Sequence, residues 1–417
     1  MRTLFLTIVT CLLSSLIFAQ SSTGWRGKSR DGAYRESGLL KSWPEEGPEL
    51  LWSVSDVGKG YSSPVISGDK VFVTGLNEDG DKEQFSAYNL KGEKLYQIEF
   101  GTAWNASYSD SRTTPAVLGD KAYVIGGMGE IVCININSGK ILWSVNGAEK
   151  FGKQAGNWGT CESPLVFDNK VIYSPGGKQT TLVALNALNG ETIWQSRALN
   201  DTSSYASPLL IQHKEKKQII GFTAYSMYGI NPDNGEIQWQ FSDWDFDFKD
   251  GMDGICINTP LFKDGKLFIS NAYDMQSFMF ELNDDLTAIQ LLWRNQDMGI
   301  HMGGMVVFDG IIYGTNKKKS EAGKWVAIDW NTGKTKYNTQ WEGKEKGVII
   351  MADGMLYCYE ERRGTIALVK PNPDRFEIVS EFRVIHGDGP HWAHPAIDNG
   401  MLYIRHGNAL MVYKIKT

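Results

Sequence analysis

The sequence predicts an all-β fold, an eight-bladed β-propeller of four-stranded antiparallel blades. Three features support this: a unit that restarts eight times, a two-residue turn early in most units, and an aromatic residue near their ends. The restarts are 44 to 52 residues apart, close to the period of four-stranded propeller blades. Most are marked by a small residue and proline, and they lie at Ser63 and Pro64, Thr114 and Pro115, Ser163 and Pro164, Ser207 and Pro208, Thr259 and Pro260, Gly304 and Met305, Ile349 and Ile350, and His394 and Pro395.

The third unit, residues 163–194, shows how strands arise. Its apolar residues fall in short runs that end at Gly, Asn, Asp or Pro, as in short strands joined by tight turns. Asp168 and Asn169 suit a two-residue hairpin, because such residues tolerate positive φ angles. Similar pairs stand at Gly68 and Asp69, Gly119 and Asp120, Asp264 and Gly265, Asp309 and Gly310, Asp353 and Gly354, and Asn399 and Gly400.

Four units end in Asn or Asp, a Gly four positions later and an aromatic residue four positions after that, as in Asn186, Gly190 and Trp194. Gly92 and Tyr96 keep this ending in a copy one residue shorter. We interpret the aromatic residues as wedges between neighbouring blades, because a large ring buries much area. The tryptophans assigned to blade packing are Trp52, Trp143, Trp194, Trp239 and Trp293. The fifth unit lacks the Gly, and the seventh, around residues 371–380, lacks both Gly and aromatic residue, so we expect their outer edges to differ.

The eighth unit ends at Tyr413 without room for a last strand. Residues 47–54, GPELLWSV, look like the missing strand, with Trp52 in the aromatic position. We therefore expect this N-terminal strand to complete the last blade and close the ring, which removes free sheet edges. The expected domains are a signal peptide (1–20), an N-terminal extension (21–46) and the propeller (47–417).

The first 20 residues are typical of a secretory signal peptide, with Arg2, an apolar run from Leu4 to Phe18, and then Ala19 and Gln20. The run is about 15 residues long, whereas a membrane span needs about 20. We therefore expect an exported protein, periplasmic or extracellular, that is a monomer with no transmembrane span in its mature chain.

Charge and cysteine content exclude some classes. The formal net charge is −6, from 42 Lys and Arg against 48 Asp and Glu, whereas a nucleic-acid partner requires a basic face. Four cysteines follow the expected signal peptide, and they lie in four different units. A disulfide needs Cα atoms within about 7 Å, and separate blades seldom bring them that close. We therefore expect buried free thiols. They are Cys133, Cys161, Cys256 and Cys358.

The unit endings resemble the pyrroloquinoline-quinone (PQQ) repeat family, whose blades finish in Ala-x-Asp-x-x-Thr-Gly-Lys-x-x-Trp. The matching segments are CININSGKILW, VALNALNGETIW and VAIDWNTGKTKY, and the resemblance covers about residues 49–413. It implies an eight-bladed propeller. The family includes quinone-dependent alcohol and sugar dehydrogenases, and also envelope assembly propellers that bind no quinone. The segment WRGKSRDG, followed by GLLKSWPEEGPELLW, is similar to exported bacterial members of mostly unknown function.

Residues just before each inner strand are expected to gather at the mouth of the central channel. Polar groups beside aromatic faces are typical of ligand pockets, so we interpret the mouth as a binding site. The alternative is that the rings plug the channel and bond to loop backbones. The candidate ligand-binding residues are Tyr61, Arg112, Asn157, Trp158, Glu162, Tyr205, Asn258, His301, His391, Trp392 and His394.

A PQQ-dependent dehydrogenase requires an aromatic floor, cations for the quinone carboxylates, calcium held by oxygen ligands and an aspartate base. Trp158 or Trp392 would stack on the quinone, Arg112 would pair with a carboxylate, and Glu162 with Asn258 would supply oxygens. The adjacent-cysteine disulfide and long insertions of many such alcohol dehydrogenases are absent. PQQ with calcium therefore stays open, and no catalytic residue is assigned.

Two groups resemble metal ligands. Residues 243–254, DWDFDFKDGMDG, alternate aspartates, but Phe248 and Gly254 stand where an EF-hand needs Gly and Glu, so we interpret this segment as a solvated acidic loop. His391 and His394, with His301, are candidate ligands of a transition metal. The spacing of three between His391 and His394 suits a helix face better than the loop-to-strand junction expected here. No metal site is expected.

The sequence thus predicts an exported propeller scaffold that binds a protein or small ligand at its channel-mouth loops, rather than an enzyme. A quinoprotein alcohol or sugar dehydrogenase is the main alternative. A carbohydrate-binding or carbohydrate-active propeller is the third.

Overall fold

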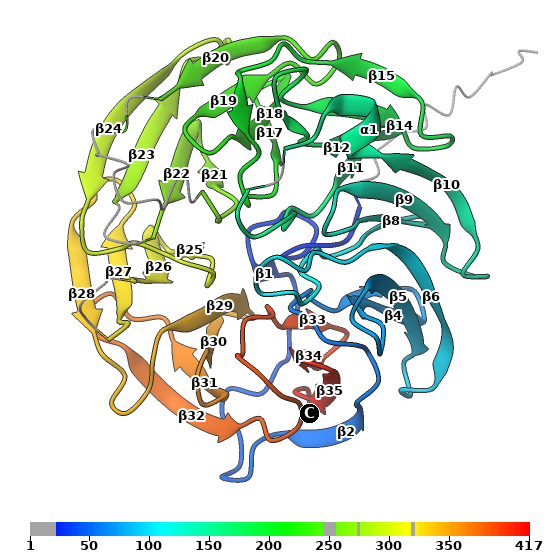
Figure 1. The fold of residues 1–417 in the computed structure, drawn as a ribbon. Coiled ribbons are helices and arrows are strands. Elements are labelled where there is room, and N and C mark those ends of the chain that lie inside the picture. Colours follow the sequence, from blue (N-terminus) through cyan, green and yellow to red (C-terminus); the bar gives the residue numbers. More distant parts are fainter. Residues whose placement is uncertain (1–21, 155, 243, 245–255, 273–275, 318–321) are drawn as a thin grey trace, which may run out of the picture.

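The computed structural model describes residues 22–154, 156–242, 244, 256–272, 276–317 and 322–417. Eight antiparallel sheets surround a central channel, which confirms the predicted all-β, eight-bladed propeller (Figure 1). In these ranges the helical structure is limited to α1 (Gly147–Phe151). No helix there is long and apolar enough to cross a membrane.

The blades are numbered in chain order, and the strands of each run from the channel outward. Blade 1 contains β3 (Val65–Ser67), β4 (Lys70–Leu76), β5 (Lys82–Asn89) and β6 (Lys94–Thr102). Blade 2 contains β7 (Ala116–Leu118), β8 (Lys121–Ile125), β9 (Glu130–Asn135) and β10 (Ile141–Asn146). Blade 3 contains β11 (Leu165–Phe167), β12 (Lys170–Tyr173), β14 (Val183–Asn186) and β15 (Thr192–Gln195). Blade 4 contains β17 (Leu209–His213), β18 (Lys216–Phe222), β19 (Met227–Ile230) and β20 (Ile237–Phe241).

The second half of the ring repeats this order. Blade 5 contains β21 (Leu261–Lys263), β22 (Lys266–Ser270), β23 (Ser277–Leu282) and β24 (Ile289–Asn295). Blade 6 contains β25 (Val306–Phe308), β26 (Ile311–Thr315), β27 (Trp325–Asp329) and β28 (Thr335–Thr339). Blade 7 contains β29 (Gly347–Ala352), β30 (Met355–Glu360), β31 (Thr365–Lys370) and β32 (Glu377–Arg383). Blade 8 contains β33 (Ala396–Asp398), β34 (Met401–His406), β35 (Ala409–Lys414) and β2 (Glu49–Val54). A small sheet pairs β13 (Gly176–Gly177) with β16 (Asp201–Thr202).

The inner hairpins adopt the predicted turns. Asp168 and Asn169 have φ angles of 44° and 57°, and Asp309 and Gly310 have φ angles of 46° and 73°, as a tight hairpin requires. Because successive strands run in opposite directions, every segment that precedes an inner strand lies on the same face of the ring. We call it the mouth face, and the inner hairpins lie on the opposite face.

The closing pattern of each unit builds the joint between blades. In all eight blades the outer strand carries a β-bulge one residue before the aromatic position, as at Leu142, which lies between the paired residues Ile141 and Trp143. A bulge re-aims the following side chain and disrupts the exposed strand edge. The Trp143 ring lies against Gly190 of the next blade, where an added Cβ would be 2.8 Å from the ring. The same ring-on-glycine contact joins Trp52 to Gly92, Tyr96 to Gly139, Trp194 to Gly235, and Trp293 to Gly333.

Three wedge positions depart from this contact. Tyr337 of blade 6 faces blade 7, which lacks the Gly, and its ring centroid lies 6.5 Å from that of Phe376. Trp239 instead donates from Nε1 to Gln218 Oε1 of its own blade at 2.9 Å. Blade 7 has Ser380 at the aromatic position, and Trp43 of the N-terminal segment occupies the joint. The Trp43 backbone N–H donates to Ser380 Oγ at 2.9 Å, and its ring meets Phe382 edge-on, with centroids 5.2 Å apart. The outer edge of blade 7 thus differs from the others, as expected. Trp43, which lies outside the repeats, fills the space where the other units place their own aromatic ring.

The N-terminal strand closes the ring, as predicted. Strand β2 pairs antiparallel with β35 and becomes the outer strand of blade 8, so the blue and red ends of the propeller meet in Figure 1. Hydrogen bonds from Arg405 link blade 8 to the start of blade 1. Its buried guanidinium donates to the carbonyls of Gly58 at 2.8 Å and Thr74 at 2.6 Å.

Residues 23–34 run through the central channel, a path that the sequence did not predict (Figure 1). Thr23 bridges to Val117 of blade 2, and β1 (Ala33–Tyr34) adds to β29 as a parallel fifth strand of blade 7. Between them Arg30 donates to the carbonyls of Ser163 at 3.2 Å and Pro208 at 3.1 Å. This segment therefore fills the channel below the mouth.

Candidate functional site at the channel mouth

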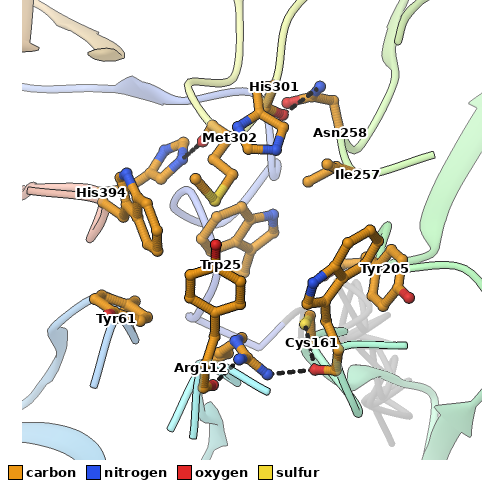
Figure 2. Close-up of a pocket in the computed structure, with 14 residues that line it drawn as sticks. Trp25, Tyr61, Arg112, Cys161, Tyr205, Ile257, Asn258, His301, Met302 and His394 are labelled. Carbon is orange, nitrogen blue, oxygen red and sulfur yellow. Dashed lines mark hydrogen bonds between the residues drawn. The ribbon is translucent and has the colours of Figure 1, made fainter. Parts of the chain in front are cut away.

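A cavity of about 260 Å³ lies at the mouth face (Figure 2). Its lining residues belong to the segments that precede the inner strands, except for one that belongs to the N-terminal segment. Most of its lining is apolar or aromatic. The lining residues are Trp25, Tyr61, Tyr108, Arg112, Trp158, Cys161, Tyr205, Ser207, Ile257, Asn258, His301, Met302, Trp392 and His394.

The structure brings eight of the eleven candidate residues to this cavity: Tyr61, Arg112, Trp158, Tyr205, Asn258, His301, Trp392 and His394. The other three lie outside its lining. Asn157 is exposed, and Glu162 is buried toward blade 3, where Oε1 accepts from Ser174 N at 2.8 Å. His391 is buried beside His406, with ring centroids 3.7 Å apart, and its Nδ1 forms a hydrogen bond with Tyr359 OH at 2.5 Å.

Two groups of aromatic side chains form the walls. On one side Tyr61 lies 4.9 Å from Trp392 and Tyr108 lies 6.3 Å from it, between ring centroids. On the other side Trp158 and Tyr205 meet at 5.4 Å in an edge-on arrangement. These tilted and edge-on geometries are the favourable ones for aromatic pairs. Both groups line the cavity, and Figure 2 shows Tyr61 and Tyr205 on opposite sides of it.

Trp25 closes the cavity from the channel side. Its Nε1 donates to Thr259 Oγ1 at 3.1 Å, and its ring lies 4.5 Å from that of His394. The next residue, Arg26, is buried beneath and donates from Nη1 to His394 Nδ1 at 3.0 Å and to Ile349 O at 3.2 Å. The sequence offered one hint of this floor, a Trp and two Arg clustered in a segment outside the repeats.

Both histidines of the cavity are held neutral. His394 accepts from Arg26 at Nδ1 and donates from Nε2 to Met302 O at 2.8 Å, which fixes one neutral tautomer. Burial, and then the charge of Arg26, lower the pKa of His394 well below its usual value. Burial, with a smaller contribution from Lys346, lowers the pKa of His301 to about 3. Neither ring therefore supplies a cation near neutral pH.

Arg112 provides positive charge at the cavity wall. Its guanidinium donates to the carbonyls of Ser107, Tyr108 and Trp158, with 3.2 Å to Ser107 O. Among the described lining residues there is no Asp or Glu. Glu83 is close enough for its pKa to be affected by Arg112, but burial outweighs that effect and raises the pKa to about 7. Asp110, outside the lining, interacts with the Tyr61 hydroxyl and is a second acidic group near this wall.

The described lining does not fit a calcium ion with a bound quinone. Calcium requires several oxygen ligands, usually including carboxylates, and no acidic side chain of the described residues lines the cavity. The Asn258 amide nitrogen is engaged with Ile300 O at 2.8 Å and His301 O at 3.0 Å. The described ranges contain no group of three His, Cys, Asp or Glu placed to hold a metal. The acidic segment 243–254 lies outside the described residues, apart from Trp244.

The four cysteines among the described residues are free thiols. Cys133, Cys256 and Cys358 are buried, as expected, whereas Cys161 is half-buried in the cavity wall. Burial raises the pKa of Cys161, which keeps the thiol protonated and weakly nucleophilic. The cavity is thus suited to binding rather than to thiol chemistry.

A family model described as "Outer membrane protein assembly factor BamB" matches residues 33–157 and 100–245, which together span just over half of the chain. The curated outer membrane protein assembly factor BamB of Moranella endobia (strain PCIT) is 23% identical over 246 residues, 57% of this chain and 55% of that protein. The match thus spans little more than half the length of the relative.

Solved structures agree on the fold. BamB from Moraxella catarrhalis matches with a TM-score of 0.62 at 14% identity, covering 88% of this chain and 99% of that one. A quinohemoprotein alcohol dehydrogenase from Comamonas testosteroni matches with a TM-score of 0.68 at 12% identity, covering 94% and 80%. Identities this low establish the fold only. From the matched blades, the chain belongs to the PQQ-repeat propeller family described as outer membrane protein assembly factor BamB.

Proposed function

We propose that this protein is an exported scaffold that docks a protein partner on its mouth face and takes part in assembling proteins of the outer envelope. The observation that carries the proposal is the aromatic cavity at the centre of that face, on a propeller of the assembly-factor family. A ring of like blades is a rigid frame, so its specificity lies in the loops. Export is part of the proposal, with residues 1–20 as its signal.

Exposed apolar side chains on the mouth face support partner docking. Tyr108 is 64% exposed beside the cavity, and Met128 is 43% exposed on the loop between β8 and β9. Aromatic residues and methionine are enriched in the cores of protein interfaces. The dehydrogenase alternative is less well supported, because the described lining does not fit calcium and quinone.

Site-specific photo-crosslinking tests the proposal. A photoreactive residue replaces Tyr108 in one variant and Leu188 in the other. Leu188 is a matched control, because it is 63% exposed and lies in the turn between β14 and β15, on the opposite face. In cells of the natural host, we expect Tyr108 to capture a component of the outer-membrane protein assembly machinery and Leu188 to capture none. Equal capture at both positions, or none at Tyr108, would overturn the proposal.

A further inference from the structure

We propose that the channel-mouth cavity binds one aromatic group that carries a carboxylate, as a C-terminal aromatic residue of a polypeptide does. The inference rests on the proposed function, which it deepens by naming the chemistry that the mouth recognises. A free aromatic acid has the same chemistry, so the experiment below separates the two sources. The proposal stands on the size of the cavity, its walls, its floor and its charge.

The size fits a single residue. An apolar cavity of about 150 Å³ is large enough to bind benzene, and pockets for drug-sized ligands start at about 300 Å³. The cavity of about 260 Å³ lies between these values. It therefore has room for one aromatic ring with a small polar group attached, and little more.

The walls fit a planar ring. Trp392 with Tyr61 on one side, and Trp158 with Tyr205 on the other, present aromatic surface to the same space. A ring inserted between them makes offset or edge-on contacts on both sides, each worth about 0.5–1.5 kcal/mol beyond area burial. Because Trp25 closes the floor, the ligand enters from the mouth face and does not pass through. A blind cavity of this kind suits the end of a chain or a free molecule.

The charge fits a carboxylate. Three carbonyl oxygens fix the Arg112 guanidinium, which has five N–H donors, so that donors remain for a ligand. Arginine in a fixed orientation is well matched to a carboxylate and forms strong charge-assisted hydrogen bonds with it. His301 and His394 are neutral, and the described lining contains no Asp or Glu. Asp110 interacts with Tyr61 from outside the lining, so Arg112 is the charged side chain that lines the cavity itself. A cationic ligand, by contrast, would meet Arg112.

The test compares an acid with its amide on the whole protein. N-acetyl-L-phenylalanine and N-acetyl-L-phenylalaninamide differ only in the charged group, and calorimetric titration of each gives a dissociation constant. We expect the acid to bind at least tenfold more tightly than the amide. Equal binding of the two, or no binding of either, would overturn the proposal, and neither result depends on the folding of a variant.

Variants then locate the site. Arg112→Gln is expected to weaken the acid at least tenfold and to make acid and amide bind alike, whereas Arg197→Gln, an exposed arginine outside the cavity lining, leaves both unchanged. Circular dichroism checks that each variant is folded. Loss of the acid's advantage in Arg197→Gln, or its retention in folded Arg112→Gln, would contradict the assignment.

A peptide that ends in phenylalanine separates the sources. Tighter binding of the free-acid peptide than of N-acetylphenylalanine, lost on amidation, identifies a polypeptide terminus. Binding of the small acid without the peptide identifies a free aromatic acid. If Tyr108 crosslinks persist without any acid binding, this inference alone fails. If the acid binds and no crosslink forms, the proposed function alone fails.

Discussion

The substitution Trp43→Ala tests the finding that the N-terminal segment completes the joint of blade 7. Trp43 is 6% exposed and packs against Phe382 and Tyr357, with centroids 5.2 Å and 5.8 Å away. Burial of about 150–250 Å² at roughly 25 cal/mol per Å² corresponds to about 4–6 kcal/mol, an upper bound. Measured costs for such large-to-small changes are about 3–5 kcal/mol, and we expect Trp43→Ala to lower the free energy of unfolding by this amount.

A conservative variant isolates the role of the ring. The Trp43 indole N–H has no hydrogen-bond acceptor among the described residues, so Trp43→Phe loses no side-chain hydrogen bond and keeps an aromatic edge toward Phe382. We expect it to cost less than about 1.5 kcal/mol, as for other near-conservative core changes. Leu188→Ala, at an exposed turn, is expected to stay within about 0.5 kcal/mol of the parent.

Urea unfolding provides the assay. It is followed by tryptophan fluorescence and far-ultraviolet circular dichroism, and coincident transitions are required before free energies are extracted. A loss below about 1 kcal/mol for Trp43→Ala, or equal losses for the Ala and Phe variants, would show that the Trp43 ring does not complete the joint of blade 7.

Two further predictions concern blade packing and pH. Gly92→Ala places a Cβ 2.8 Å from the Trp52 ring at φ +83°, whereas Gly68→Ala, at φ +61°, meets nothing within 4 Å. Both variants bear backbone strain, so we expect Gly92→Ala to cost about 1–3 kcal/mol more in urea unfolding, and equal costs would contradict the wedge contact. Burial raises the pKa of Glu83 from 4.5 to about 7, so ionised Glu83 is unfavourable in the folded protein, and its stability contribution is lost as pH rises through this range. Between pH 5 and pH 8 the parent is expected to lose about 2–3 kcal/mol relative to Glu83→Gln. Parallel stability profiles of the two proteins would contradict this.

The sequence was sufficient for the parts of the fold that are local and repeated. The hairpin at Asp168 and Asn169 and the ring of Trp143 follow from turn chemistry and spacing within one unit. The pairing of β2 with β35 was also predictable, because the last unit lacked a strand that the N-terminal region displayed. These features depend on patterns that recur along the chain.

The N-terminal segment was not predictable in the same way. Trp25, Arg26 and Trp43 have no counterpart in the repeats, and their partners are distant in sequence, as with Arg26 and His394. Loops also lack the alternation that tells which way a side chain faces. Trp158 lines the cavity while its neighbour Asn157 is exposed, and Cys161 lines it while Glu162 points into blade 3.

We propose that a protein partner docks over the aromatic cavity of the mouth face. The most direct test is the affinity of the partner captured at Tyr108, once purified, for the parent protein and for two variants. We predict that Trp392→Ala, in the cavity wall, weakens binding at least tenfold, while Leu188→Ala on the opposite face leaves it unchanged. Unchanged affinity for folded Trp392→Ala, or equal losses in both variants, would contradict the claim.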